Sequence, residues 1–358
     1  RIRVDGVLLE IVSPPRTLSL ALISRVKIMC NMDISERRLP QDQRIEIKVG
    51  DSLIDIRVAT LPTLFGENIV MRLLDRTAVK IDLDKLGFAP QVLKPIKTII
   101  HRPNGIFLVT GPTSSGKTTT LYACLTELNQ VGVKIITTED PVELQIDRIV
   151  QVQVKEDIGL TFAACLRSIL RQDPDIVMVG EIRDLETAQI AVEASLTGHL
   201  VLSTIHTNSA PETITRLLDM DLEPFLITAS LSAVLAQRLV RVVCRHCHEI
   251  YAPDKDEMNF LGLPRSWRDD PNLRFARPKG CPACDYTGYM GRVGLFELLV
   301  VDEKVCDLIL NRAMAHDIRK HARRHQGMLT LREAGLIKCV QHVTTPEEVL
   351  QHTDHYED

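Results

Sequence analysis

Hydrophobic and polar positions follow two different patterns along this chain, and the change comes near residue 100. In the first part, apolar residues recur at every second position over short segments, which is the spacing of strands that bury one face. From Gly105 onward, short apolar runs alternate with longer segments of helical spacing. Strands and helices in alternation predict a parallel sheet covered by helices. We therefore expect an α/β domain preceded by a smaller α+β domain.

The first part is predicted to form an antiparallel sheet with one helix packed across it, and a turn at Gly50-Asp51. If residues 54, 56 and 58 face the core, the alternation turns Asp55 and Arg57 to the opposite face. Arg72 lies on a further strand. The predicted strands are residues 2–4, 7–12, 45–49, 54–58 and 69–74, and the predicted helix is 18–32.

Residues 105–128 carry the strongest chemical signal. An apolar strand leads into Gly111-Pro-Thr-Ser-Ser-Gly-Lys-Thr118, which fits G-x-x-x-x-G-K-[ST], and a helical segment follows. In such a phosphate-binding loop, backbone N–H groups and the helix N-terminus hold the phosphates. Lys117 is expected to pair with β- and γ-phosphate oxygens, and Thr118 to place its hydroxyl on Mg²⁺. The expected nucleotide-binding residues are Gly111, Pro112, Thr113, Ser114, Ser115, Gly116, Lys117, Thr118 and Thr119.

Three later strands end in ionisable residues, at Glu139, Glu181 and His206. Because parallel strands present their carboxyl ends at one sheet edge, these residues are expected to meet beside the phosphate loop. Glu181 follows four apolar residues as a Walker-B acid does, with Gly180 where an Asp is usual. Either glutamate could bind Mg²⁺ through water or orient the attacking water. His206 is open to two interpretations, a γ-phosphate sensor or a structural histidine, whereas His199 is expected to be structural.

Four of the nine cysteines form two C-x-x-C pairs, which are separated by 33 residues. Thiolates at this spacing suit a tetrahedral structural Zn²⁺, and a redox-active pair is the alternative. The remaining cysteines are expected in the core, and nine cysteines without a visible secretory signal favour a reducing compartment. The expected zinc ligands are Cys244, Cys247, Cys281 and Cys284.

Composition narrows the class of protein only slightly. The chain has 358 residues, 45% apolar and 25% charged, which is ordinary for two or three globular domains. A formal charge of −4 gives no general reason to expect a nucleic-acid binder. No apolar run reaches the roughly 18–20 residues that span a bilayer. The first residue is Arg1 rather than Met, so we expect the chain to begin inside a longer protein.

Four segments together resemble the secretion ATPase superfamily, in the branch that serves type II secretion and type IV pilus assembly. In chain order they are similar to its Walker A, Asp box, Walker B and His box. Residues 215–226 are more similar to type II secretion members, and the C-x-x-C pairs argue against the pilus-retraction subfamily. Ser115 and Thr138 depart from the usual glycine and valine. The four segments are residues 111–118, 138–143, 171–187 and 197–208.

The resemblance implies a RecA-like P-loop NTPase core with a smaller N-terminal α+β (PAS-like) domain and a zinc-bearing insert. Arg57 and Arg72 match positions where the smaller domain of this family reaches the phosphates, a role that suits guanidinium groups; surface ion pairs are the alternative. Glu181 matches the Walker-B glutamate and Glu139 the Asp-box acid. The implied boundaries are an N-terminal domain at 1–98 and an ATPase domain at 99–358, divided into a core (about 99–240), a tetracysteine subdomain (about 241–290) and C-terminal helices (about 291–358).

The implied activity is hydrolysis of ATP, with Mg²⁺, by a hexameric ring that drives pseudopilus assembly and protein export by type II secretion. The ring would lie at the cytoplasmic face of the inner membrane, contacting it only through the secretion platform and cytoplasmic-domain partner proteins. The nearest alternative is a type IV pilus assembly (extension) ATPase. A nucleic-acid translocase is disfavoured by the charge and by the lack of interleaved aromatic and basic residues. A third alternative is a nucleotide-regulated scaffold with little turnover.

Overall fold

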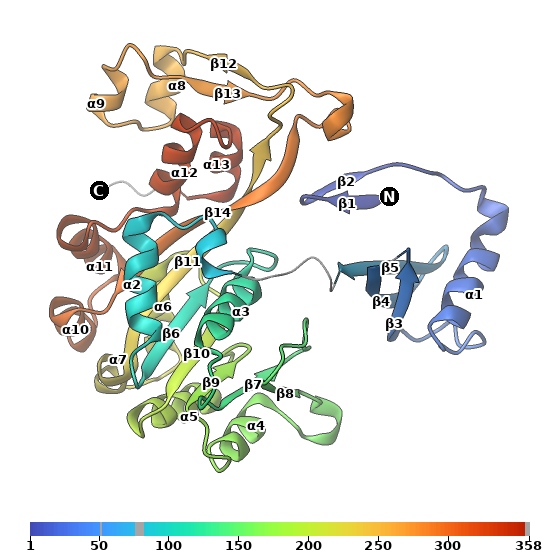
Figure 1. Ribbon diagram of the computed structural model, residues 1–358, viewed down its shortest axis with the longest axis horizontal. Coiled ribbons are helices and arrows are strands. Elements are labelled where there is room, and N and C mark those ends of the chain that lie inside the picture. The colour runs from blue at the N-terminus through green and yellow to red at the C-terminus, as the bar shows by residue number, and fades with distance from the viewer. Residues whose placement is uncertain (51, 76–81, 355–358) are drawn as a thin grey trace. The chain divides into compact units, whose positions relative to one another are not determined.

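The computed structural model describes residues 1–50, 52–75 and 82–354, so Asp51 of the expected turn lies outside the described residues. The chain divides into two compact units, Arg1–Lys80 and Ile81–Asp358 (Figure 1). The domain boundary inferred at residue 98 falls inside helix α2 (Pro90–Ile100). Ile96, Ile99 and Ile100 of this helix are buried in the core of the second unit, so the whole helix belongs to that unit.

The first unit contains a three-stranded antiparallel sheet of order β3-β4-β5, one helix and a separate hairpin. Ile56 and Val58 are buried against Cys30 and Met32 at the end of the helix, as the alternation predicts. Arg44, Arg57 and Arg72 are directly paired across the three strands, so they form one row on the opposite sheet face. The elements are β1 (Ile2–Val4), β2 (Val7–Leu9), η1 (Arg16–Leu18), α1 (Ser19–Met29), β3 (Gln41–Val49), β4 (Ser52–Thr63) and β5 (Gly66–Asp75).

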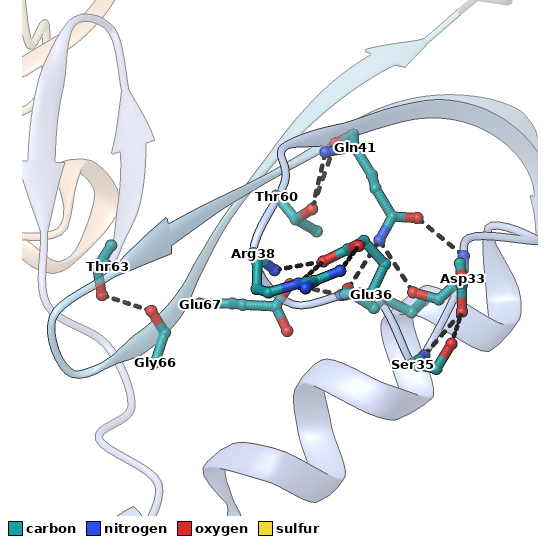
Figure 2. A network of polar contacts seen from close by, with 10 residues as sticks. Asp33, Ser35, Glu36, Arg38, Gln41, Thr60, Thr63, Gly66 and Glu67 are labelled. Carbon is teal, nitrogen blue, oxygen red and sulfur yellow. Dashed lines mark hydrogen bonds and ion pairs between the residues drawn. The ribbon is translucent and has the colours of Figure 1, made fainter.

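A network of polar contacts fastens the loop after α1 to this sheet (Figure 2). Lys27, which is only 1% exposed, forms an ion pair of 2.5 Å with Glu67 and donates to the carbonyl of Glu36 at 2.7 Å. The Gln41 side chain donates to the Asp33 carbonyl at 2.9 Å and accepts from the Asp33 N–H at 2.8 Å. Because Lys27 is on α1 and Glu67 on β5, the buried pair fixes the helix against the sheet.

The second unit is built on a seven-stranded sheet of order β14-β11-β6-β10-β9-β7-β8. Neighbouring strands are parallel except at the edge, where β14 runs antiparallel to β11. The strands expected after Gly105 are present, and β8, β11 and β14 add to them. The strands are β6 (Gly105–Thr110), β7 (Ile135–Glu139), β8 (Val150–Gln153), β9 (Ile176–Val179), β10 (Leu200–Ile205), β11 (Leu231–Val243) and β14 (Tyr289–Val300).

Helices cover both faces of this sheet, as the alternating pattern predicts (Figure 1). Strand β6 shows why, because Ile106 and Leu108 enter one core cluster while Phe107 and Val109 enter the other. Helices α2 and α3 (Lys117–Leu128), with the short turn η2 (Leu83–Lys85), cover the second cluster. The first cluster is covered by α4 (Phe162–Ile169), α5 (Leu185–Leu196), α6 (Ala210–Asp219) and α7 (Pro224–Ser230). The short turn η3 (Glu156–Ile158) lies between β8 and α4.

A small lobe between β11 and β14 holds the four cysteines of the two C-x-x-C pairs and packs on the C-terminal helices. Its core joins Leu263 and Phe275 to Leu336 and Val349 of those helices. None of the helices within residues 1–50, 52–75 and 82–354 is long and apolar enough to cross a membrane. The remaining elements are β12 (Glu249–Tyr251), α8 (Lys255–Phe260), α9 (Arg265–Arg268), β13 (Phe275–Arg277), η4 (Pro282–Cys284), α10 (Glu303–Leu310), α11 (Ala315–His321), η5 (Ala322–Gln326), α12 (Leu331–Val340) and α13 (Pro346–His352).

Candidate functional site

The phosphate loop connects β6 to α3 in the expected strand, loop and helix order. Gly111 has φ +146°, and a Cβ there would lie 2.5 Å from the carbonyl oxygen of Gln237, so no larger residue fits without a shift. Ser115 fits in place of the usual glycine because its φ is not positive and its side chain is buried beneath the loop. The residues with exposed surface in this segment are Pro112, Thr113, Ser114, Thr118 and Thr119.

Lys117 lies at the first position of α3, with its ammonium folded against the loop. It donates to the carbonyls of Gly111 at 2.8 Å and Pro112 at 3.1 Å. Burial is the main cause that lowers the pKa of Lys117 to about 8; the charge of Glu181 opposes it, and the charge of Arg238 adds to it. A partly desolvated ammonium beside N–H groups of a helix N-terminus is well suited to phosphate oxygens.

Glu181 and His206 meet at the carboxyl ends of β9 and β10, as expected. The imidazole Nε2 of His206 lies 3.5 Å from a carboxylate oxygen of Glu181, and Glu181 is 17% exposed. Burial first, and then the charge of Lys117, lower the pKa of His206, so its imidazole is neutral at neutral pH. Gly111, Pro112 and His206 line one cavity, so His206 borders the phosphate loop. Lys117, Glu181 and His206 therefore share one site.

Glu139 also ends its strand, but its surroundings differ from those of Glu181. The side chain is buried, and one oxygen accepts from the Thr137 hydroxyl at 2.6 Å and the Gln151 amide at 2.9 Å. The other oxygen accepts from the hydroxyl of Tyr122, which is on α3. Both oxygens are thus engaged by protein donors, and the carboxylate links the phosphate-loop helix to the strand ends.

Arg183, two residues after Glu181, is a site residue that sequence reasoning did not single out. Its guanidinium donates to Glu181 at 2.5 Å and lies 3.8 Å from carboxylates of both Asp140 and Glu156. The signal available in the sequence was the Glu-x-Arg spacing, which does not reveal that these acids converge. Arg183 fixes the direction in which the Glu181 carboxylate points.

Gln237 on β11 contacts the phosphate loop from the neighbouring strand, and the sequence analysis also missed it. Ala236 pairs with Thr110 in the parallel register, which sets the next two residues beside the loop. The buried Gln237 amide donates to the Ser115 carbonyl at 2.7 Å and accepts from the Thr120 hydroxyl at 2.8 Å. One side chain therefore holds both the loop and the first turns of α3.

Replacing Gln237 by Met is expected to weaken ATP binding about tenfold, because two buried hydrogen-bond partners lose their contacts at the loop. Thr120→Ser, which keeps the hydroxyl, is the matched control and is expected to bind ATP like the original chain. Titration with a fluorescent ATP analogue measures both dissociation constants. Equal ATP affinities of the Gln237→Met and Thr120→Ser variants would contradict the inference that Gln237 holds the phosphate loop in place.

Nucleotide affinity is expected to fall as pH rises above about 8, the pKa of Lys117 in the free protein. Phosphates favour the charged ammonium, so nucleotide binding raises the pKa of Lys117. At a pH between the pKa values of the free and the bound protein, binding therefore takes up a proton. The dissociation constant should then rise by up to about tenfold per pH unit. Lys117→Arg, whose guanidinium stays charged, should abolish this slope. An affinity independent of pH from 7 to 9.5 in the original chain would contradict it.

A cavity of about 660 Å³ adjoins the site on the His206 side. It begins at Gly111 and Pro112 and extends along α6 to the loop that leads into α11, at residues 312–315. The nucleotide site therefore opens toward the C-terminal helices.

Arg57 and Arg72, the expected phosphate-sensing arginines, lie in the first unit. Arg57 forms an ion pair of 2.7 Å with Asp42, and the Arg72 side chain is exposed.

The four expected zinc ligands come together in the small lobe. The Sγ atoms of Cys244 and Cys281 are 3.9 Å apart, and Cys284 lies 3.8 Å from both Cys247 and Cys281. Four thiolates at about 2.3 Å from one Zn²⁺ would be about 3.8 Å apart, so the cluster fits a tetrahedral site. All four ligand atoms lie within 4.8 Å of one another.

Backbone donors around Cys284 favour its thiolate. Burial raises its pKa, but the N–H groups of Cys281 and Gly288, at 3.3 and 3.2 Å from the sulfur, bring it down to about 6. Gly288 is required there, because its φ is +77° and a Cβ would lie 2.4 Å from Pro278. The lowered pKa of Cys284 favours its thiolate, the form that binds a metal ion.

Comparison with known proteins identifies the family and agrees with the fold. The family described as "Type II/IV secretion system protein" matches residues 1–351. Type II secretion system ATPase E of Vibrio cholerae is 52% identical over 353 residues, which cover 99% of this chain and 69% of that protein. Type IV pilus assembly ATPase PilB of Myxococcus xanthus is 51% identical over 356 residues, with coverage of 99% and 62%.

Among solved structures, the pilus retraction motor PilT with bound ADP has a TM-score of 0.63 at 27% identity, covering 89% of this chain and 78% of that one. It supports the RecA-like interpretation of the seven-stranded sheet. With a family match along nearly its whole length and relatives at about half identity, this chain belongs to the type II/IV secretion system protein family.

Proposed function

We propose that this chain is the ATPase motor of a type II secretion system, in which ATP hydrolysis drives pseudopilus assembly and protein export. The observation that carries the proposal is the convergence of the phosphate loop, Glu181 and His206 at one sheet edge. Its support from sequence is 52% identity to type II secretion system ATPase E of Vibrio cholerae.

In this proposal the residues at the strand ends have different roles in ATP hydrolysis. The loop N–H groups and Lys117 bind the β- and γ-phosphates, and Thr118, which is an exposed residue, would hold Mg²⁺ through its hydroxyl. Mg²⁺, when bound with ATP, neutralises charge on the phosphates. Glu181, aimed by Arg183, orients the attacking water and accepts its proton. Neutral His206 beside Glu181 contacts the γ-phosphate by a hydrogen bond rather than by charge.

Glu139 is assigned a structural role, because both of its carboxylate oxygens accept hydrogen bonds from protein donors and the side chain is buried. It holds Tyr122, and through it α3, in register with the ends of β7 and β9. The phosphate loop and Glu181 then keep a fixed separation, which is the geometric requirement for an oriented water. Its catalytic contribution is therefore made through position.

Arg57 and Arg72 are proposed to reach the phosphates when the two units close on ATP, and to release them after hydrolysis. Cycles of closure and release in a hexameric ring would move partner proteins of the inner-membrane secretion platform. The tetracysteine lobe is proposed to bind one structural Zn²⁺. The ring is proposed to sit at the cytoplasmic face of the inner membrane, held there by partners.

Type IV pilus assembly is the second candidate, favoured by 51% identity to PilB of Myxococcus xanthus. A strain lacking this gene distinguishes the two. If the original gene restores export of an enzyme to the culture medium and Lys117→Ala does not, the secretion proposal holds. Restored surface pili without export would support the pilus alternative. Absence of Mg²⁺-dependent ATP hydrolysis by the purified full-length protein would refute both.

A further inference from the structure

A buried carboxylate outside the nucleotide site joins two helix N-termini. Glu297 lies on β14 and is 0% exposed. One of its oxygens accepts from the N–H of Ala210, at 2.7 Å, and the other from the N–H of Leu331, at 3.3 Å. Ala210 is the first residue of α6 and Leu331 the first residue of α12, so both helices direct their positive ends at one carboxylate.

Arg319 on α11 provides a second link to the same place. Its side chain is buried, donates to the hydroxyl of Ser209 at 3.3 Å and lies 3.7 Å from Glu212. Ser209 caps α6 through the N–H of Glu212. Burial raises the pKa of Glu297 to about 7, against the opposing effects of the Ala210 N–H and the Arg319 charge. Helices α11 and α12 are thus both anchored to the start of α6.

From the start of α6, hydroxyl groups that are buried or partly buried continue to the phosphate loop. The Thr207 hydroxyl donates to the Ser209 carbonyl at 3.1 Å and lies 2.7 Å from the hydroxyl of Thr110. The N–H of Thr207 donates to that same Thr110 hydroxyl at 2.8 Å. Thr110 immediately precedes Gly111, and Thr207 immediately follows His206. The chain of contacts therefore ends at the start of the phosphate loop and beside His206.

We propose that Glu297 is a positioning residue for ATP hydrolysis, which couples the C-terminal helices α11 and α12 to His206 and the phosphate loop through α6. The proposal rests on the proposed ATPase function. A movement of the C-terminal helices relative to the sheet would shift Ser209 and Thr207, because each link is a directed hydrogen bond in a packed interior. The hydrolysis step would thereby respond to whatever displaces those helices in the motor.

Replacing Glu297 by Gln in the full-length protein keeps the volume but turns one acceptor into a donor that faces a backbone N–H. We expect kcat to fall about tenfold while the dissociation constant of a non-hydrolysable ATP analogue stays within twofold. Glu333→Gln is the matched control. Glu333 caps the same helix α12 and pairs with Arg323, but none of its described contacts reaches α6. It should lower the melting temperature without lowering kcat.

Coupling is tested by combining Glu297→Gln with Thr207→Val. If both act through one chain of contacts, the double variant should be about as slow as the slower single variant rather than showing the product of both losses. If Glu297→Gln does not fold, Arg319→Lys replaces it, because lysine keeps the charge but loses the reach to Ser209. Multiplicative losses, or a kcat loss matched by Glu333→Gln, would overturn the proposal. An original chain without ATP hydrolysis would instead overturn the proposed function.

Discussion

Alanine at both Arg57 and Arg72 is expected to lower ATP turnover about a thousandfold or more while ATP stays bound. The phosphate loop and Lys117 lie in the second unit and would be unchanged, so affinity should be largely retained. Charge that develops on the γ-phosphoryl group in the transition state would lose its guanidinium partners, a loss of the size seen for arginine fingers. Steady-state phosphate release and analogue binding, measured on the same preparation, check both parts.

Arg44 is the natural control, because it belongs to the same cross-strand row but pairs with the buried Asp55. Lysine is the substitution used at all three positions. It keeps a positive charge, which Asp55 needs, but lacks the planar guanidinium group that binds two phosphate oxygens at once. Arg57→Lys and Arg72→Lys are expected to slow turnover at least tenfold, and Arg44→Lys to leave it unchanged. If all three variants hydrolyse ATP as fast as the original chain, Arg57 and Arg72 take no part in hydrolysis.

Serine in place of Cys284 is expected to abolish zinc binding and unfold the lobe between residues 244 and 288. The core of this lobe is small, and a structural zinc site contributes on the order of 10 kcal/mol to folding of such modules. Because Leu263 and Phe275 pack on the last helices, the melting temperature of the second unit should also fall. Metal analysis and limited proteolysis of the lobe report both effects.

Cys306→Ser is the control for this experiment, since Cys306 is a partly buried cysteine of α10 outside the four-sulfur cluster. It is expected to keep one zinc ion per chain and the original melting temperature. Retention of zinc by Cys284→Ser, or unchanged resistance of its lobe to proteolysis, would show that the four sulfurs do not form the site.

Local patterns were sufficient to predict the elements whose residues are close in sequence. The four central parallel strands are short apolar runs that end at marked residues, and the phosphate loop is a contiguous motif. The C-x-x-C pairs predicted the sulfur cluster because ligand type and spacing define such a site. The alternation at residues 54–58 placed Arg57 on the face opposite the core, which the structure bears out.

Other features depend on long-range packing, which local patterns do not encode. Gln237 contacts Ser115 and Thr120 from more than a hundred residues away, and only the parallel register of β11 on β6 brings it there. Glu139 and Glu181 each lie at the end of a predicted strand, so the sequence pattern predicts the same role for both. They differ in the structure because Tyr122, which approaches from α3, donates to Glu139 and not to Glu181. Similarly, the register of β14 along β11 determines that Glu297 faces the start of α6.

The central claim is that Glu181 orients the water that cleaves ATP held on the loop from Gly111 to Thr118. Rapid chemical quench of ATP prebound with Mg²⁺ to Glu181→Gln protein tests it most directly, because glutamine keeps the shape but cannot accept the proton. The account predicts intact bound ATP over times in which the original chain completes many turnovers. Conversion of that bound ATP to ADP at the original rate would contradict it.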